Sequence, residues 1–290
     1  MVDENGEVRG EFYRTKPNVE VERLERVLGL DFGPVKPKKM EVNTVNQLVA
    51  FFSDKGVFGR LHFLSSRKKK KEYYGMYLPE IDTVVTTRES GLYRPLTLLH
   101  ENIHAWIARV SGDKDYVNGT TRNKVLSIAR LRAEKSDLTQ MAEVERFLIW
   151  DMVMEGICYY GSINAMVMGE TSDMETKKAA VEFHNMLVGK EGLEDATLLL
   201  LPPSPDVVTD LMNTSDKLVV GRTAAKDAGN YLNLVQYNLG EKLDMIGYAA
   251  VLRWMEMKKN EGKSIKQGLE ELVASPPRNL GELRKMIRPV

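Results

Sequence analysis

The sequence predicts an α+β fold, with a small antiparallel sheet and one histidine-bearing helix followed by a mainly helical C-terminal part. Three observations support this prediction. Short segments rich in β-branched and aromatic residues lie between residues 56 and 87. From Pro95 onward, apolar residues recur at helical spacing almost without interruption. An apolar share of 43% in 290 residues is enough to form a sizeable core.

Composition limits the partners and the chemistry. Lys plus Arg equals Asp plus Glu at 41 each, so no net field draws the chain to nucleic acid or to an anionic membrane. The single cysteine, Cys158, excludes an internal disulfide and a site of several thiolates, so a bound metal would need nitrogen and oxygen donors. The N-terminus lacks the apolar core of a signal peptide, and no stretch approaches the roughly eighteen apolar residues of a membrane span. We therefore expect a cytoplasmic protein.

The N-terminal region is expected to carry no chemistry. Residues 1 to about 17 are charged and predict a loose tail, which an amphipathic helix follows from Asn18 to about Leu30. The connector DFGPVKPKKM contains two prolines and leads to a second helical stretch at about 44–53. The predicted strands of the sheet are VFGRLHFL, EYYGMYL and DTVVTT.

The rest of the chain is predicted to be helical, at roughly 95–111, 121–134, 137–168, 173–189, 206–213, 217–258, 264–273 and 280–287. The stretch from 217 is expected to break near Gly229 or Gly240. The prolines of LLLLPPSPD at 198–206 cannot continue a helix, so this segment is the clearest interruption. The predicted organisation is a tail and helix at 1–40, a metal-binding domain at 41–197, and a helical subdomain at 198–290.

A metal-binding pattern lies in the helix RPLTLLHENIHAWIARV. His100 and His104 are four residues apart, so they project from one face and can bind one ion at about 2 Å each. Glu101 would point toward a water on that ion and take its proton. Only four histidines occur in the chain, so a chance match to this pattern is well below roughly one percent. We expect the ion to be Zn²⁺.

A catalytic zinc normally takes a third protein ligand. Ile107 and Val110 stand where the extended metzincin pattern requires Gly and His, so that class is excluded. Glu155 is the best candidate, because a lone carboxylate in an apolar helix is costly without a cation. Gly156 beside it would let two helices approach closely. The alternative third ligands are His62 and His184.

With Glu155-Gly156 placed 51 residues after His104, the pattern resembles the gluzincin (thermolysin-like) zinc metallopeptidases. The resemblance covers about residues 73–165 and implies a zincin-like fold. It also implies that His100, His104 and Glu155 are the zinc ligands, that Glu101 is the general base, and that a strand preceding the helix lies along a peptide substrate. The family places an Asp four residues after the ligand Glu to orient a zinc histidine, whereas this chain has Tyr159 there. Asp151 is an alternative residue for that task.

An oxyanion donor is also needed, and Tyr237 is the candidate, followed by a glycine in a Tyr-x-x-Gly helix. Other candidates are Tyr231, Tyr159, Tyr160 and His184, although aromatic residues at helical spacing are more often core. Cys158 is more often a small core residue than a reactive thiol. The basic run Arg67–Lys71 predicts a solvated hairpin loop.

The expected function is therefore a zinc metallopeptidase that hydrolyses peptide bonds through a metal-bound water activated by Glu101. Its partner would be a peptide or protein substrate. Two alternatives stay open. One is hydrolysis of another amide by the same zinc and base, and the other is a non-catalytic protein that retains the site for metal or partner binding. A purely structural site would need no base such as Glu101.

Overall fold

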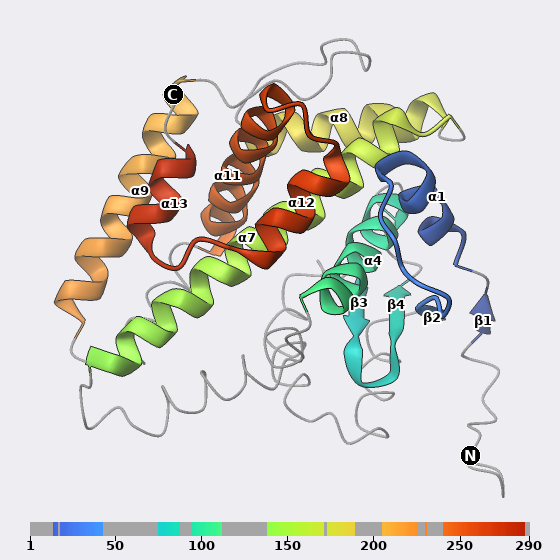
Figure 1. The fold of residues 1–290 in the computed structure, drawn as a ribbon, viewed down its shortest axis with the longest axis horizontal. Helices are drawn as coiled ribbons and strands as arrows, with labels where there is room; N and C mark the ends of the chain where they lie inside the picture. Colours follow the sequence, from blue (N-terminus) through green and yellow to red (C-terminus); the bar gives the residue numbers. More distant parts are fainter. Residues whose placement is uncertain are drawn as a thin grey trace, which may run out of the picture.

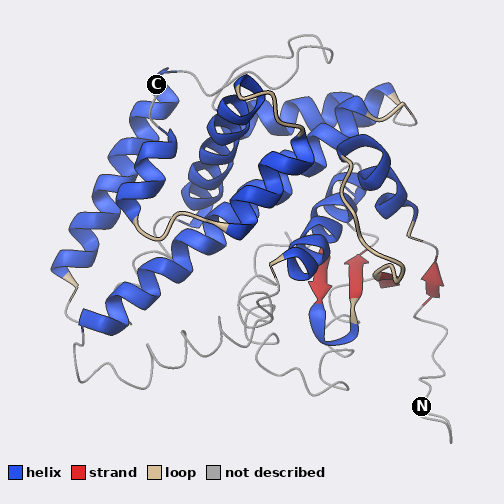
Figure 2. Ribbon diagram, viewed as in Figure 1, coloured by secondary structure: helices blue, strands red, loops and turns tan. Residues whose placement is uncertain are grey.

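A computed structural model describes residues 14–16, 18–42, 75–87, 94–111, 138–170, 173–188, 205–225, 230 and 240–287. Over these residues the protein has the predicted α+β composition, and helices predominate (Figure 2). The elements in chain order are β1 (Arg14–Lys16), α1 (Val19–Leu28), β2 (Lys38–Val42), β3 (Gly75–Leu78), the 3-10 helix η2 (Pro79–Ile81), β4 (Thr83–Thr87), α4 (Arg94–Val110), α7 (Leu138–Met168), α8 (Met174–Val188), α9 (Pro205–Ala224), α11 (Gly240–Asn260), α12 (Ile265–Ala274) and α13 (Leu280–Ile287).

The sheet lies at one end of the molecule, next to α4 and α1 (Figure 1). Its strand order is β1-β2-β4-β3. The outer pairs are antiparallel, whereas β2 and β4 run parallel, with Lys38 opposite Thr83 and Val42 opposite Thr87. The prediction of a purely antiparallel sheet is therefore wrong for the central pair. Residues 43–82 connect these two strands, and such a long connection can return the chain for parallel pairing.

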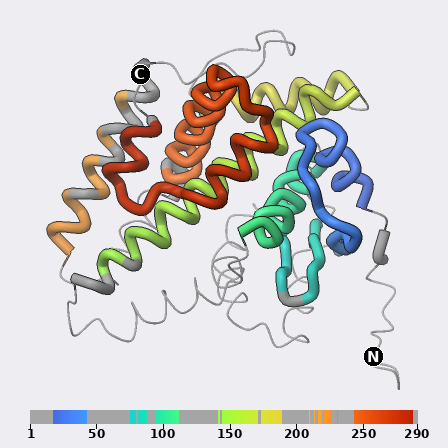
Figure 3. The backbone as a smooth tube through the Cα atoms, in the orientation of Figure 1, coloured from blue at the N-terminus to red at the C-terminus, as the bar shows by residue number. Residues whose placement is uncertain are grey.

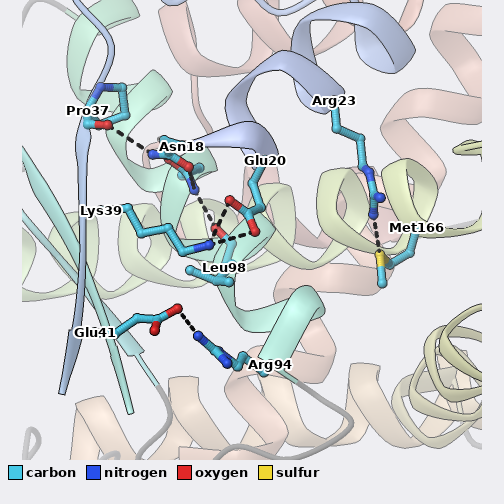
Figure 4. Close-up of polar contacts among 10 residues, drawn as sticks. Asn18, Glu20, Arg23, Pro37, Lys39, Glu41, Arg94, Leu98 and Met166 are labelled. Carbon is cyan, nitrogen blue, oxygen red and sulfur yellow. Dashed lines mark hydrogen bonds and ion pairs between the residues drawn. The ribbon is translucent and has the colours of Figure 1, made fainter. Parts of the chain in front are cut away.

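Strand β2 corrects the prediction of a connector at residues 31–40. Two of its charged residues are buried, and each has an ionic partner (Figure 4). Lys39 Nζ lies 2.9 Å from a carboxylate oxygen of Glu20 on α1, and Glu41 pairs with Arg94 at the start of α4. The strand is thus joined by side chains to both helices that pack beside the sheet.

The helices largely follow the prediction. Those expected at 95–111, 137–168, 173–189, 264–273 and 280–287 correspond to α4, α7, α8, α12 and α13. The predicted helix ending at residue 213 is wrong, because α9 continues unbroken to Ala224. Helix α11 begins at Gly240, which is one of the two positions where the long helical stretch from 217 was expected to break. The predicted helices at 44–53 and 121–134, the strand VFGRLHFL and the run Arg67–Lys71 lie outside the described residues.

Helix α7 organises the core. It runs from the end formed by α9 and α13 to the end formed by α1 and α4 (Figure 3). Helix α11 packs on it most extensively. At their crossing a Cβ on Gly156 would lie 2.3 Å from the carbonyl oxygen of Gly247, so the two backbones touch. The expectation that Gly156 allows a close helix approach is confirmed. Among the described helices, none is long and apolar enough to cross a bilayer.

Candidate metal centre

The histidine-bearing helix α4 is held in place from several sides. Leu99, Ile103 and Trp106 are fully buried and form its apolar face. Asn102, between the two histidines, is also fully buried. Its side-chain NH₂ donates to the carbonyl of Leu98 at 2.7 Å, and its carbonyl oxygen accepts from the side-chain NH₂ of Asn18 at 2.7 Å (Figure 4). The bond to Leu98 stays within α4, whereas the bond to Asn18 ties the helix, beside its histidines, to the segment that precedes α1.

The β3–β4 hairpin positions Glu101. The backbone N–H of Tyr77 donates to Glu101 Oε2 at 2.8 Å. A Cβ on Gly75 would lie 3.1 Å from Glu101 Cγ and 2.7 Å from Thr97 Cγ2, so a glycine is needed for this close approach. The hairpin turn is fastened to the end of α4, because Arg109 pairs with Asp82 at 2.7 Å. The side chain of Glu101 therefore extends from α4 to β3, an outer strand of the described sheet.

Three side chains from α4 and α7 bring their donor atoms together. Nε2 of His100 lies 3.2 Å from Nε2 of His104 and 3.1 Å from Oε2 of Glu155. Nε2 of His104 lies 3.7 Å from Oε1 of Glu155. A tetrahedral ion with bonds of 2.0–2.1 Å needs donor atoms about 3.3 Å apart. The spacing and the donor types, two imidazoles and one carboxylate, therefore fit a zinc ion.

The same residues are locally accessible within otherwise buried stretches. From Met152 to Met166 every residue of α7 is buried except Glu155 and Tyr159. On α4, His100, Glu101 and His104 are half-buried between fully buried neighbours. The side chains of the three donors are exposed by 12%, 20% and 28% for His100, His104 and Glu155. The donor cluster is therefore reachable from solvent, unlike the core around it.

Cys158 offers a second choice of third donor. Its sulfur and the ligand nitrogens of His100 and His104 all lie within 4.8 Å of one another. The cysteine is fully buried. Burial, with the neighbouring carboxylates of Glu155 and Glu101, raises the pKa of its thiol well above the usual value. We favour Glu155, because its oxygens lie 3.1 and 3.7 Å from the nitrogens of His100 and His104, whereas a thiol must lose its proton before it binds a metal.

A cluster of aromatic rings contacts the donor residue His100. The ring of Tyr159 contacts His100, with 4.6 Å between centroids and 59° between planes. Tyr159 in turn contacts Phe183 of α8 and Tyr248 of α11, at 5.4 and 6.5 Å. Tyr248 is fully buried, and its hydroxyl lies 2.7 Å from Nδ1 of His184. Burial raises the pKa of the Tyr248 hydroxyl well above its usual value.

The structure brings the donor atoms of His100, His104 and Glu155 together, and Glu101, on the same helix as the histidines, accepts from the backbone of Tyr77. Asp151, the candidate for orienting a histidine, is half-buried one turn before Glu155, and Tyr159, which stands where the gluzincins have an Asp, contacts His100. His184, an alternative third ligand, is buried and paired with Tyr248. His62, Tyr231 and the predicted oxyanion donor Tyr237 lie outside the described residues.

Sequence reasoning missed Gly75, Tyr77 and Tyr248. The contacts of these residues depend on how strands and helices pack. Gly75 and Tyr77, for example, are 24 or more residues away from Glu101 in the sequence and approach it only in the fold. The pair Gly247-Tyr248 carried a signal, because a glycine inside an apolar helix is typical of a close backbone approach.

Comparisons with known proteins add no relative. No profile of a protein family, no curated protein and no solved structure matches this chain.

Proposed function

We propose that the protein is a zinc-dependent metallopeptidase with a gluzincin-like, zincin-type arrangement of its metal site. His100, His104 and Glu155 would hold the ion, and Glu101 would be the general base. The observation that carries the proposal is the convergence of three side chains from two helices, with 3.1, 3.2 and 3.7 Å between their donor atoms. The two imidazoles and the carboxylate form the donor set of an open catalytic zinc site.

The bound ion would supply a Lewis acid that polarises a carbonyl and lowers the pKa of water to about 7. Glu101 takes the proton of the attacking water and passes it to the leaving nitrogen. The N–H of Tyr77 holds Oε2 of Glu101, which fixes the direction of the carboxylate during both transfers. A Cβ at position 75 would lie 3.1 Å from Glu101 Cγ, so the glycine leaves the room that this carboxylate occupies.

The choice of peptides over other amides rests on the gluzincin resemblance and on the place of β3. In the described sheet β3 is an outer strand, and it lies beside α4. An extended peptide can pair with such an edge, whereas a small amide gains nothing from it. Tyr237 is proposed as the oxyanion donor on the sequence pattern alone.

A second function is favoured by one observation, the position of Cys158. If the thiolate of Cys158 joined His100, His104 and Glu155, four protein donors would close the coordination shell. A closed shell is typical of structural zinc, so the protein would then bind metal without turnover. The sulfur needs to be deprotonated for this, which its buried position opposes.

Peptide cleavage by the zinc-loaded chain tests the proposal. We expect the wild-type protein to cleave members of a peptide library, with the products read by mass spectrometry. A chelator should abolish cleavage, and added zinc should restore it. Glu101→Gln should lower kcat by about 10² to 10⁴, the usual contribution of a general base, with unchanged zinc content.

The matched control is Glu182→Gln, because Glu182 is an exposed helical glutamate on α8. This variant should keep wild-type activity and zinc content. Full activity in Glu101→Gln would remove Glu101 as the base. A zinc-loaded wild-type protein that cleaves no peptide would instead support the closed site with Cys158.

A further inference from the structure

We propose that Tyr159 is the positioning residue that sets the orientation of the His100 imidazole. The inference rests on the proposed metal site, in which His100 is a ligand. Tyr159 lies one turn after Glu155 on α7, so the third donor and this ring approach His100 from the same helix. The rings of Tyr159 and His100 are in contact, with centroids 4.6 Å apart and planes inclined by 59°.

The imidazole needs such a partner because two of its neighbours do not fix the plane of the ring. His104 meets His100 edge-on, at 69° and 4.9 Å between centroids, and Glu155 meets it only at Nε2. Rotation about the bond to the ring changes where Nε2 points. A residue that locks a metal-binding histidine in its productive rotation raises metal affinity, and losing it typically costs 10- to 100-fold.

Tyr159 can set this orientation because its own position is fixed from two other helices. Phe183 of α8 and Tyr248 of α11 both contact its ring. Tyr248 is held in turn by its neighbour Gly247, whose backbone touches that of Met152. Helices α8 and α11 therefore contact Tyr159, and Tyr159 contacts His100.

The contact can be measured on the metal-free full chain by NMR of labelled histidine. The ring of Tyr159 should displace the ring-proton resonances of His100, which are assigned by their loss in His100→Asn. Nuclear Overhauser effects should join the ring protons of His100 and Tyr159. Tyr159→Phe keeps the ring and should preserve the displaced resonances, whereas Tyr159→Leu should move them toward the positions of an exposed histidine.

Tyr248→Phe is the matched control, because it removes a buried hydrogen bond and leaves every ring beside His100 in place. It should destabilise the fold and leave the His100 resonances near their wild-type positions. Unchanged His100 resonances in folded Tyr159→Leu would overturn the inference. If that variant does not fold, absence of the nuclear Overhauser effects in the wild type overturns it.

Titration with Co²⁺ supplies the second measurement. Tyr159→Leu should raise the Kd for Co²⁺ by 10- to 100-fold and alter the visible spectrum of the bound ion. Tyr159→Phe should keep the wild-type Kd and spectrum, because it retains the ring. A wild-type Kd and spectrum in Tyr159→Leu would contradict the proposed role. A wild-type chain that binds neither cobalt nor zinc would refute the metal site, whereas the NMR result on the metal-free chain still tests Tyr159 by itself.

Discussion

The third donor is the residue on which the metal centre depends most. Without a cation, the carboxylate of Glu155 lies within 3.7 Å of two imidazole nitrogens and inside a buried stretch of α7. A partly buried carboxylate of this kind is stabilised by a positive partner. A metal ion bound by both imidazoles would supply that partner.

Substitution of Glu155 and of Cys158 should show which of the two is the third zinc ligand. Glu155→Gln removes the charge and keeps the shape, so zinc affinity should fall by more than about 100-fold, beyond the effect of an outer contact. Cys158→Ser should change affinity by less than about tenfold. Competition with a chromophoric chelator measures both. Equal loss in the two variants would assign the sulfur to the metal.

Gly75 should control the position of the base. In Gly75→Ala the new methyl group would lie 2.7 Å from Thr97 Cγ2 and 3.1 Å from Glu101 Cγ, so the Glu101 side chain must shift. We expect kcat to fall by about tenfold or more, because small misplacements of a catalytic group are costly, with unchanged zinc affinity.

The second change Thr97→Ser checks this explanation. It deletes the methyl group that lies nearest to the new Cβ and should recover part of the lost kcat. If Gly75→Ala has the wild-type kcat, or if Thr97→Ser recovers nothing, contact between the hairpin and Glu101 does not position the base.

The convergence of three side chains could be predicted from the sequence because local rules place them. The spacing of His100 and His104 fixes one helical face, and a carboxylate in an apolar helix identifies Glu155. The contacts of Tyr248 and Gly75 could not be predicted. They depend on which faces of α11 and β3 meet α7 and α4, and spacing along the chain carries no such information.

At the scale of elements, α7 and α11 cross with their backbones in contact. A Cβ on Gly247 would lie 1.8 Å from the carbonyl oxygen of Met152, which is backbone and cannot rotate away. Gly247→Ala should therefore lower the free energy of unfolding by about 3 kcal/mol, at the upper end of overpacking effects. Urea denaturation followed by circular dichroism measures it.

The control for this substitution is Gly281→Ala on α13. Gly281 is exposed, and the nearest atom to its new Cβ is a side-chain oxygen of Asn279 at 3.1 Å. Alanine is the better helix former by about 1 kcal/mol, so stability should rise by up to that amount. Equal effects of the two substitutions would mean that the crossing is loose.

The elements that sequence reasoning misplaced are those that tertiary contacts stabilise. β2 contains Lys39 and Glu41, which are buried only because Glu20 and Arg94 pair with them. Helix α9 continues past a polar stretch because Leu218 is buried. Its Arg222 also pairs with Glu145 of α7 at 2.6 Å. Amphipathic helices such as α1 and α4 were predictable, since their pattern alone indicates a buried face.

At the scale of the whole molecule, buried tyrosines set an alkaline limit to stability. Burial raises the pKa of Tyr160 to about 12, whereas the pKa of a tyrosine in the unfolded chain is about 10. The folded state therefore keeps a proton that the unfolded state loses. The stabilisation is complete below pH of about 10 and is lost as pH rises toward about 12.

Denaturation at a series of alkaline pH values tests this limit. The free energy of unfolding should fall between pH of about 10 and about 12 in the wild type, and less steeply in Tyr160→Phe. The same decline in both proteins would show that Tyr160 does not contribute to it.

In the proposed metal centre, one zinc ion binds between α4 and α7 through two imidazoles and a carboxylate. X-ray absorption of the zinc-loaded chain measures these bonds directly. We predict one zinc per chain with nitrogen and oxygen neighbours at about 2.0–2.1 Å. A sulfur neighbour at about 2.3 Å, or a chain that retains no zinc, would contradict the claim.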